Sequence, residues 1–331
     1  MSPQKESMDI NETQKALNDL KEHVSLRIIG QERLIENMLV CLLCDGHMLI
    51  EGMPGLAKTT AAKALAGGIE GDFHRVQFTP DLLPSDLVGT DIYLQEKSKF
   101  EFRQGPLFHN IILADEINRA PAKVQSALLE SMEEKQITVG MTTYKLPELF
   151  MVLATQNPVE QEGTYNLPEA QLDRFLMNAI VEYPTPEEEL AILKLDQQLA
   201  KNKTEPAKKT VKIAQKTILE ARKQVLDVYI DDRIKDYIVA IVNATRFPKE
   251  YSKDLHRWLR CGASPRASLA LVKCSKALAW LNGDEYVSPH HVQKLANEIL
   301  RHRIIPSFEA EAEAVSRSNI VKHLIEVVAV A

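Results

Sequence analysis

Residues 48–66 have the sequence MLIEGMPGLAKTTAAKALA, and this stretch decides the fold class. A short apolar strand, Met48–Ile50, leads into a turn of glycine and proline, and the helix-forming run Ala61–Ala66 follows directly. Backbone N–H groups of such a turn point toward one position, and the N-terminus of the next helix adds partial positive charge there. The stretch therefore predicts a loop that binds polyphosphate, with Lys58 on the β- and γ-phosphates and the Thr59 hydroxyl on Mg²⁺.

One residue of this loop departs from the phosphate-loop motif GxxxxGK[ST]. Ala57 occupies the position where the motif has glycine before the lysine. A methyl group is a small intrusion if the φ angle of Ala57 is negative, so the departure weakens the motif without removing it. The residues predicted to bind nucleotide here are Gly52, Pro54, Gly55, Leu56, Ala57, Lys58, Thr59 and Thr60.

Composition narrows the class of protein. The 331 residues are 45% hydrophobic and 26% charged, which is typical of a globular protein with about two domains. The net charge of −6 argues against tight nonspecific binding to nucleic acid. The apolar run Met38–Cys44 is too short to span a bilayer, and the polar stretch Met1–Thr13 has no export signal. We therefore expect a cytoplasmic protein without membrane insertion.

Apolar stretches that alternate with helical patterns predict an α/β fold with a five-stranded parallel sheet. The five expected strands are Met48–Ile50, Phe73–Phe78, Ile111–Ala114, Phe150–Ala154 and Ala179–Val181. Two inserts, Phe100–Pro106 and Gln136–Leu146, show period-two patterning with turn residues, and the second predicts a β-hairpin.

A domain boundary is predicted at Tyr183–Glu189. Thr185 suits the N-cap of a helix, Pro186 suits its first position, and Glu188 completes a capping box. The predicted domains are therefore an α/β core over residues 1–184, with an N-terminal helix, and a smaller all-helical domain over residues 185–331. A lysine-rich stretch, Lys201–Lys212, is expected to be a solvated loop. Helices are expected at Asp232–Thr245, Ala267–Asn282 and Val292–Arg301.

Acidic and amide side chains follow two of the predicted strands. Asp115 and Glu116 come directly after Ile111–Ala114, at the edge where open parallel sheets bind ligands. Taken alone, this pair would be interpreted as a helix cap. Together with the lysine and threonine of the loop, it predicts Mg²⁺ binding by Asp115 and activation of the attacking water by Glu116. Asn157, after the next strand, is positioned to hydrogen-bond the same water or the γ-phosphate.

These motifs together resemble the MoxR family of AAA+ ATPases. The resemblance is carried by Gly52–Thr59, by Leu113–Pro121 continuing through Gln125–Glu130, and by Asn157–Tyr165 continuing through Leu167–Phe175. It covers roughly residues 28 to 300, and alanine before the loop lysine is usual in that family.

The resemblance implies roles for two arginines. Arg174 matches the arginine finger, which completes the nucleotide site of the neighbouring subunit in trans. Arg266, in Gly262–Ala267, matches the lid arginine that touches the γ-phosphate in cis. The local sequence agrees, because Ser264 can cap a helix that begins at Pro265. Arg119 is either a second arginine across the interface or part of a surface salt bridge, and Tyr251–Arg260 receives no assignment.

The resemblance also implies a function. We expect an ATPase that uses ATP and Mg²⁺, works as a homo-oligomeric ring, most simply a hexamer, and remodels or matures a partner protein in a chaperone-like way. Family members act with proteins that carry a von Willebrand factor A domain, and the two inserts match hairpins that face a central pore or a partner.

Two other functions are weighed against this one. The first is a nucleic-acid motor, like the MCM or RuvB relatives, which the acidic charge and the lack of a basic and aromatic run disfavour. The second is a nucleotide-gated binding module that hydrolyses little. The complete set of catalytic residues argues against it.

Overall fold

The computed structural model describes residues 9–157, 163–201 and 212–330. Residues 158–162 of the motif that begins at Asn157, and most of the lysine-rich stretch predicted as a loop, lie outside the described residues. The chain forms two compact units, which are described separately. The sheet unit comprises Lys15–Leu167 and Ala179–Leu219, and the helical unit comprises the residues up to Gln14, Pro168–Asn178 and the chain from Glu220 onward.

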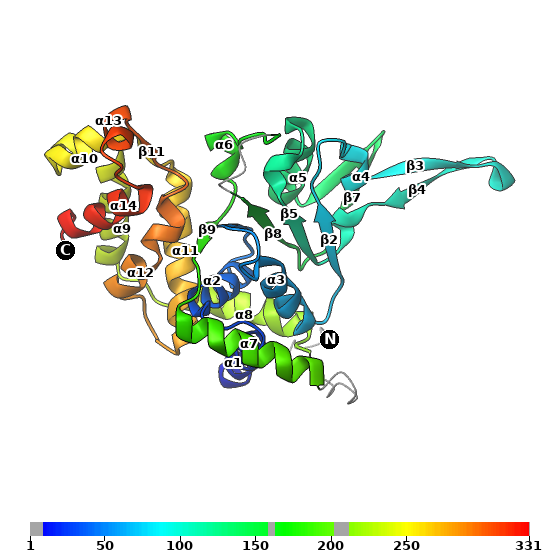
Figure 1. Cartoon of the computed structure of the whole chain (residues 1–331), viewed down its shortest axis with the longest axis horizontal. Helices are drawn as coiled ribbons and strands as arrows, with labels where there is room; N and C mark the ends of the chain where they lie inside the picture. The colour runs from blue at the N-terminus through cyan, green and yellow to red at the C-terminus, as the bar shows by residue number, and fades with distance from the viewer. Residues whose placement is uncertain (1–8, 158–162, 202–211, 331) are drawn as a thin grey trace, which may run out of the picture. The chain divides into compact units, whose positions relative to one another are not determined.

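A five-stranded sheet in the order β2-β5-β8-β1-β9 is the centre of the sheet unit (Figure 1). Its strands are β1 Met48–Gly52, β2 Phe73–Gln77, β5 Ile111–Asp115, β8 Met151–Gln156 and β9 Met177–Val181. The β2–β5, β5–β8 and β8–β1 pairs are parallel. Every residue of β5 is buried, and so are the first five of β8, because helices cover both faces of these central strands.

Helices of the sheet unit connect these strands. They are α2 Glu32–Leu43, α3 Lys58–Gly67, α4 Pro84–Val88, α5 Ala122–Glu134 and α7 Pro186–Lys201, with α1 Ile10–Ser25 before them and α8 Gln215–Asp227 after them. The predicted capping box is present at the start of α7, where the Thr185 N–H donates to Glu188 over 2.8 Å and the Glu188 N–H donates to the Thr185 hydroxyl over 3.3 Å.

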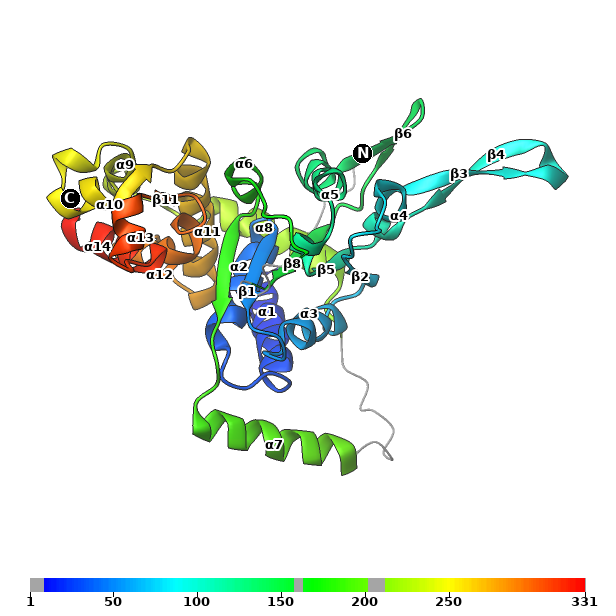
Figure 2. The same ribbon diagram turned by 45° about the horizontal axis from the view of Figure 1, so that its top comes forward.

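Two antiparallel hairpins project from the sheet unit (Figure 2). One pairs β3 Gly89–Leu94 with β4 Lys99–Gln104, and the other pairs β6 Gln136–Val139 with β7 Thr142–Lys145. The second predicted insert is therefore a hairpin, and the first supplies only one strand of the other hairpin, because the sequence did not single out Gly89–Leu94 as a strand. The Phe102 and Tyr144 rings stack at 4.2 Å, so the two hairpins pack against each other.

The helical unit is a bundle with one short β-ladder. Its elements are α6 Glu169–Leu172, α9 Asp232–Arg246, α10 Lys253–Trp258, α11 Pro265–Asn282, α12 Pro289–Leu300, α13 Phe308–Ala312 and α14 Arg317–Val327, with β10 Leu259–Cys261 paired to β11 Ile305–Pro306. The unassigned stretch 251–260 therefore forms α10 and the start of β10. Along the described parts of the chain, no helix is long and apolar enough to cross a bilayer. The domain boundary at 184/185 stays a prediction.

Candidate nucleotide site

Three neighbouring strands bring the predicted catalytic and binding residues of the sheet unit to one edge. In the parallel registers, Ile50 of β1 is level with Thr155 of β8, and Ala114 of β5 is level with Ala154. The loop after Gly52, the pair Asp115 and Glu116, and Asn157 therefore follow the carboxyl ends of adjacent strands. Ligands of open α/β sheets bind at this edge.

The loop after β1 has an unusual backbone. Gly55 has a φ of +84°, and nothing lies within 4 Å of the point where a Cβ atom would stand. Ala57 has a φ of +55°, in the left-handed region. The sequence predicts that the methyl group of Ala57 is a small intrusion if φ is negative. The observed φ is positive, so that condition is not met. A left-handed conformation costs a non-glycine residue roughly 1–2 kcal/mol, so the surrounding loop must hold Ala57 in place.

Helix α3 begins at Lys58 without a capping side chain. Ala57 occupies its N-cap position, and its methyl side chain makes no cap hydrogen bond to the first turn. The first N–H groups of an α-helix have no acceptor within the helix, and an anion is a suitable one. The Lys58 ammonium donates to the Gly52 carbonyl, which holds it over the loop. The loop is thus shaped for a polyphosphate.

Asp115 is buried at the end of β5 and accepts hydrogen bonds from two neighbouring strands. The Thr155 hydroxyl of β8 donates to its Oδ1 over 2.5 Å. Arg75 of β2 donates to its Oδ2 from Nε over 3.0 Å and from Nη2 over 2.6 Å. These hydrogen bonds hold the Asp115 carboxylate in a fixed orientation at the sheet edge.

Glu116 has a φ of +57°, so it is a second non-glycine residue in the left-handed region at this edge. Its N–H donates to the Thr155 hydroxyl over 2.9 Å, and its carboxylate accepts from Gln77 Nε2 over 2.7 Å. Arg119 Nε lies 3.1 Å from the same carboxylate. Of the two alternatives for Arg119, the structure therefore shows an ion pair within the chain. Strained residues of this kind gather at functional sites.

Asn157 lies one residue beyond β8 and is buried. Its carbonyl oxygen is 3.5 Å from Asn118 Nδ2, which follows the acidic pair on the neighbouring strand. Asn157 thus lies at the same edge as Asp115 and Glu116, as the sequence predicts.

Three residues of this network were missed from the sequence. Thr155 donates to Asp115 and accepts from Glu116, Arg75 pairs with Asp115, and Gln77 contacts Glu116. Thr155 had a visible signal, because it is a polar residue that extends an apolar strand just before Asn157. Arg75 and Gln77 had none, because their partners become evident only from the β2–β5 register.

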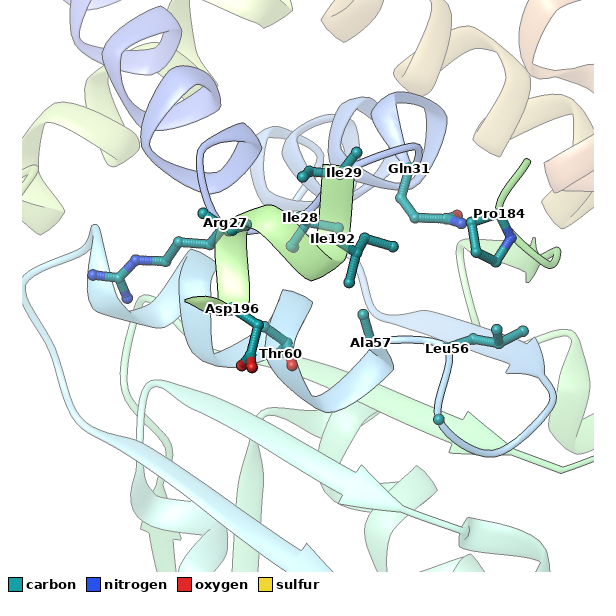
Figure 3. A pocket seen from close by; sticks show the side chains of 12 residues that line it. Arg27, Ile28, Ile29, Gln31, Leu56, Ala57, Thr60, Pro184, Ile192 and Asp196 are labelled. Atoms are coloured by element: carbon teal, nitrogen blue, oxygen red, sulfur yellow. The ribbon is translucent and has the colours of Figure 1, made fainter. Parts of the chain in front are cut away.

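A cavity of about 260 Å³ lies beside the loop (Figure 3). Its lining includes Leu56, Ala57 and Thr60 of the loop and the first turn of α3, together with the turn before α2 and Ile192, Leu195 and Asp196 of α7. In Figure 3, Ile192 approaches Ala57 from α7. The walls are mainly apolar with a few polar groups, which is typical of a site for a small ligand. The sequence did not point to this cavity.

The residues at this edge fit a nucleotide with Mg²⁺. The uncapped α3 terminus and Lys58 suit phosphates, and the cavity lies next to them. Thr59 and Asp115 offer a hydroxyl and a carboxylate, the oxygen ligands that Mg²⁺ prefers when phosphates supply the rest.

Comparison with known proteins agrees with this geometry. The family profile described as "ATPase family associated with various cellular activities (AAA)" matches residues 47–177, and the profile described as "AAA lid domain" matches residues 253–324. The chain is 43% identical over 303 residues to Chaperone MoxR1 of Mycobacterium tuberculosis, which covers 91% of this chain and 79% of the relative. It is 30% identical over 301 residues to Protein MoxR of Paracoccus denitrificans. That match covers 87% of this chain and 88% of the relative. The chain belongs to the MoxR family of AAA+ ATPases.

Two further relatives support this membership. The uncharacterized protein YeaC of Bacillus subtilis is 44% identical over 310 residues, with 93% of each chain covered. A crystal structure from Cytophaga hutchinsonii, 44% identical, superposes with a TM-score of 0.89 over 97% of each chain. The predicted MoxR resemblance and the predicted α/β AAA+ core with a helical lid are therefore confirmed, and the protein is an ATPase.

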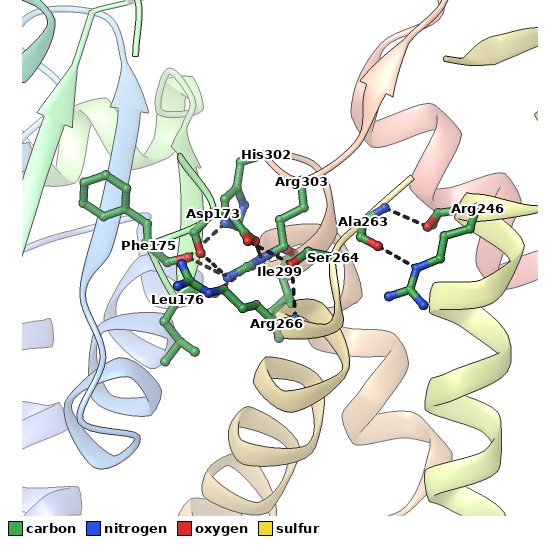
Figure 4. Close-up of polar contacts among 11 residues, drawn as sticks. Asp173, Phe175, Leu176, Arg246, Ala263, Ser264, Arg266, Ile299, His302 and Arg303 are labelled. Atoms are coloured by element: carbon green, nitrogen blue, oxygen red, sulfur yellow. Dashed lines mark hydrogen bonds and ion pairs between the residues drawn. The ribbon is translucent and has the colours of Figure 1, made fainter. Parts of the chain in front are cut away.

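The two arginines that the MoxR resemblance singles out belong to the helical unit. Arg174 follows α6, and Arg266 lies in the first turn of α11. Ser264 caps α11 as predicted, since its hydroxyl accepts from the Arg266 N–H over 3.2 Å, and Pro265 takes the first helical position. The Ser264 hydroxyl in turn donates to Asp173 Oδ2 over 2.8 Å (Figure 4), so the residue before Arg174 contacts the turn that presents Arg266.

Proposed function

We propose that this MoxR-family ATPase hydrolyses ATP in an Mg²⁺-dependent reaction, as a ring of identical subunits, and uses the energy to remodel a partner protein. The observation that carries the proposal is the single sheet edge at which the phosphate loop, Asp115, Glu116 and Asn157 meet. The family membership supports a hexameric ring, and the cytoplasm stays the predicted compartment.

Binding is assigned to the loop and the cavity. The N–H groups of the first turn of α3 donate to the phosphates, and Lys58 moves its ammonium from the Gly52 carbonyl to the β- and γ-phosphates. Ile28, Ile29 and Ile192 in the wall of the cavity suit the adenine base. Bound Mg²⁺ supplies positive charge to the phosphate oxygens, and Thr59 and Asp115 are the residues assigned to hold it.

Glu116 is assigned as the general base. Its carboxylate is held by Gln77 and Arg119 and its N–H by Thr155, so it is oriented before substrate binds. It accepts a proton from the attacking water, while the Asn157 amide orients that water. Arg266 contacts the γ-phosphate of its own subunit, and Arg174 offers its guanidinium to the nucleotide of the next subunit, where charge develops in the transition state.

Mixing two inactive variants tests the shared site. Lys58→Ala removes nucleotide binding but keeps Arg174, and Arg174→Ala does the reverse. In a mixed ring, an Arg174→Ala subunit next to a Lys58→Ala subunit receives an intact arginine, so we expect phosphate release to recover part of the wild-type rate. If the mixture stays as inactive as its components while rings still form by analytical ultracentrifugation, the assignment of Arg174 in trans is wrong.

A protein partner is proposed from the family relationship, and one relative is itself named a chaperone. A partner with a von Willebrand factor A domain is the expected class, and the two hairpins are the surfaces proposed to contact it. The Glu116→Gln variant, trapped with ATP in its native extract, should co-purify such a protein. Recovery of nucleic acid in its place would contradict the proposal.

A nucleic-acid motor remains the second candidate because of one observation. Tyr93 and Phe100 on the β3–β4 hairpin are 51% and 69% exposed, and exposed aromatic rings can stack on bases. Acidic and basic residues are balanced on this hairpin, so it has no net positive charge to attract a phosphate backbone; the acidic ones are Asp91, Glu96 and Glu101, and the basic ones are Lys97, Lys99 and Arg103. Stimulation of ATP turnover by DNA at physiological salt would favour the motor.

A further inference from the structure

The segment Asp173–Asn178, which includes Arg174, is held by three consecutive residues that directly follow α12. Arg301, His302 and Arg303 are all buried, and each hydrogen-bonds to this segment (Figure 4 for the latter two). These contacts join residues more than 120 positions apart in the sequence. Burial of a polar side chain costs free energy unless the side chain is hydrogen-bonded. Because these three side chains are bonded to one short segment, movement of the segment would break their hydrogen bonds, and its geometry is therefore fixed.

Arg303 makes most of these contacts. Its side chain is 3% exposed, and its Nε donates to Asp173 Oδ1 over 2.8 Å. Its Nη2 donates to the Phe175 carbonyl over 2.7 Å, and its Nη1 donates to the Leu176 carbonyl over 3.1 Å. The guanidinium therefore contacts the residues immediately before and after Arg174, and its planar shape permits little rotation once these bonds form.

Asp173 is shared between two elements. One carboxylate oxygen accepts from Arg303, and the other accepts from the Ser264 hydroxyl, which also caps α11 in front of Arg266. Burial lowers the pKa of the Arg303 guanidinium, and the charge of Asp173 opposes that shift. A charge-assisted pair of this kind is stronger than a neutral hydrogen bond.

Arg301 fixes the far end of the segment, and His302 adds a contact directly after Arg174. Arg301 Nε donates to Asn178 Oδ1 over 2.8 Å, and its Nη2 donates to the Asn178 carbonyl. His302 Nε2 lies 3.1 Å from the Phe175 carbonyl. The backbone on both sides of Arg174 is thus bound to residues of the helical unit, and residue 174 as a whole is partly exposed.

We propose that Arg303, acting through Asp173, is a positioning residue for Arg174 in ATP hydrolysis. Arg174 is then presented as a part of the helical unit, at a position and angle set by the residues that directly follow α12. The inference rests on the proposed role of Arg174 in trans and adds the residue that determines where its guanidinium points.

The test compares Arg303→Met with Arg174→Ala. Methionine keeps the packing of the stem but removes every donor. We expect kcat for ATP to fall about 10²-fold, because an arginine misplaced by about 1 Å loses most of its effect. The dissociation constant of a fluorescent ATP analogue should stay within about twofold, since the phosphate loop of the same subunit is unchanged.

Mixing gives a result that a structural role alone would not produce. Arg303→Met subunits keep an intact nucleotide site, so Lys58→Ala subunits should restore turnover to them, as they restore it to Arg174→Ala subunits. If only the Arg174→Ala mixture recovers, Arg303 does not act through the arginine and this inference is wrong. If neither mixture recovers, the trans role itself fails and the positioning role fails with it.

Two further variants separate positioning from stability. Val292→Ala makes a cavity in the core of the same unit and leaves Arg301, His302 and Arg303 unchanged, so at an equal loss of thermal stability it should keep turnover near the wild-type rate. Asp173→Asn keeps an acceptor for Arg303 but removes the charge, and serves if Arg303→Met does not fold. It should show the same recovery on mixing, with a smaller loss of kcat. Loss of turnover in Val292→Ala equal to that in Arg303→Met would overturn the inference.

Discussion

The phosphate loop Gly52–Thr60 and the arginine segment Asp173–Asn178 are both short, and they are built in opposite ways. The loop is shaped by its own residues, through the left-handed Gly55 and Ala57 and the helix that begins at Lys58. The arginine segment depends on Arg301, His302 and Arg303, which lie more than 120 positions later in the sequence.

This difference determines how each segment responds when other parts of the chain change. A loop whose conformation is local can keep its shape while other parts of the chain move. A segment that depends on distant side chains keeps its shape only while their unit is intact. Nucleotide binding should therefore tolerate the loss of the Arg303 contacts, whereas catalysis in the neighbouring subunit should not.

The largest expected effect lies in the sheet unit, which carries the phosphate loop. Glu116→Gln removes the proposed base, so ATP turnover should fall by about 10²–10⁴-fold. Nucleotide affinity should persist, because the phosphate loop is untouched. Phosphate release and binding of a fluorescent nucleotide measure the two. Glu130→Gln, at an exposed position of α5, is the matched control. Wild-type turnover in Glu116→Gln would refute the assignment.

A glycine in the helical unit gives the next effect. A Cβ atom on Gly262 would stand 2.5 Å from the Thr245 carbonyl oxygen, so the turn before α11 must shift. Gly262→Ala should lower the free energy of unfolding by about 1–3 kcal/mol in chemical denaturation. Gly67→Ala in α3 meets nothing nearer than 3.6 Å and should change stability by less than about 1 kcal/mol. Equal effects would contradict the steric argument.

Thr155 tests the buried network at the sheet edge. Thr155→Val removes the donor to Asp115 and the acceptor for the Glu116 N–H, and should cost about 1–2 kcal/mol of stability together with part of the turnover. Thr155→Ser keeps the hydroxyl and should retain both properties. Denaturation and phosphate release are the measurements. A valine variant as active as the serine variant would show that the bridge is dispensable.

The smallest expected effect is a pH dependence of the free energy of unfolding, caused by His302 beside the arginine segment. The pKa of His302 is held well below its usual value, chiefly by burial and then by Arg303. The unfolded chain therefore binds a proton that the folded chain does not, and stability falls as the pH falls through about 6.5. Between pH 7.5 and 5.5 the loss should be about 1 kcal/mol from this residue. His302→Gln should reduce the slope, with the exposed His256→Gln as control, and an unchanged slope would contradict the assignment.

Sequence reasoning succeeded where the deciding residues are neighbours. The apolar runs predicted the five central strands, and Ser264 with Pro265 predicted the cap of α11. It missed Arg75 and Gln77, because only strand register brings them to Asp115 and Glu116. It missed β3 because that strand is mostly exposed and lacks a buried face. It could not foresee Arg303, because nothing near that residue indicates a partner 130 positions earlier.

The Asp173–Arg303 pair also restricts how relatives can be recombined. A chimera joined at residues 184/185 would take Asp173 from one parent and Arg303 from the other. Two folded halves would then meet with a buried guanidinium and a carboxylate that had not been selected together. Exchange of residues 168–178 along with the helical unit keeps the pair within one parent, so the natural module for transplanting this arginine is discontinuous in the sequence.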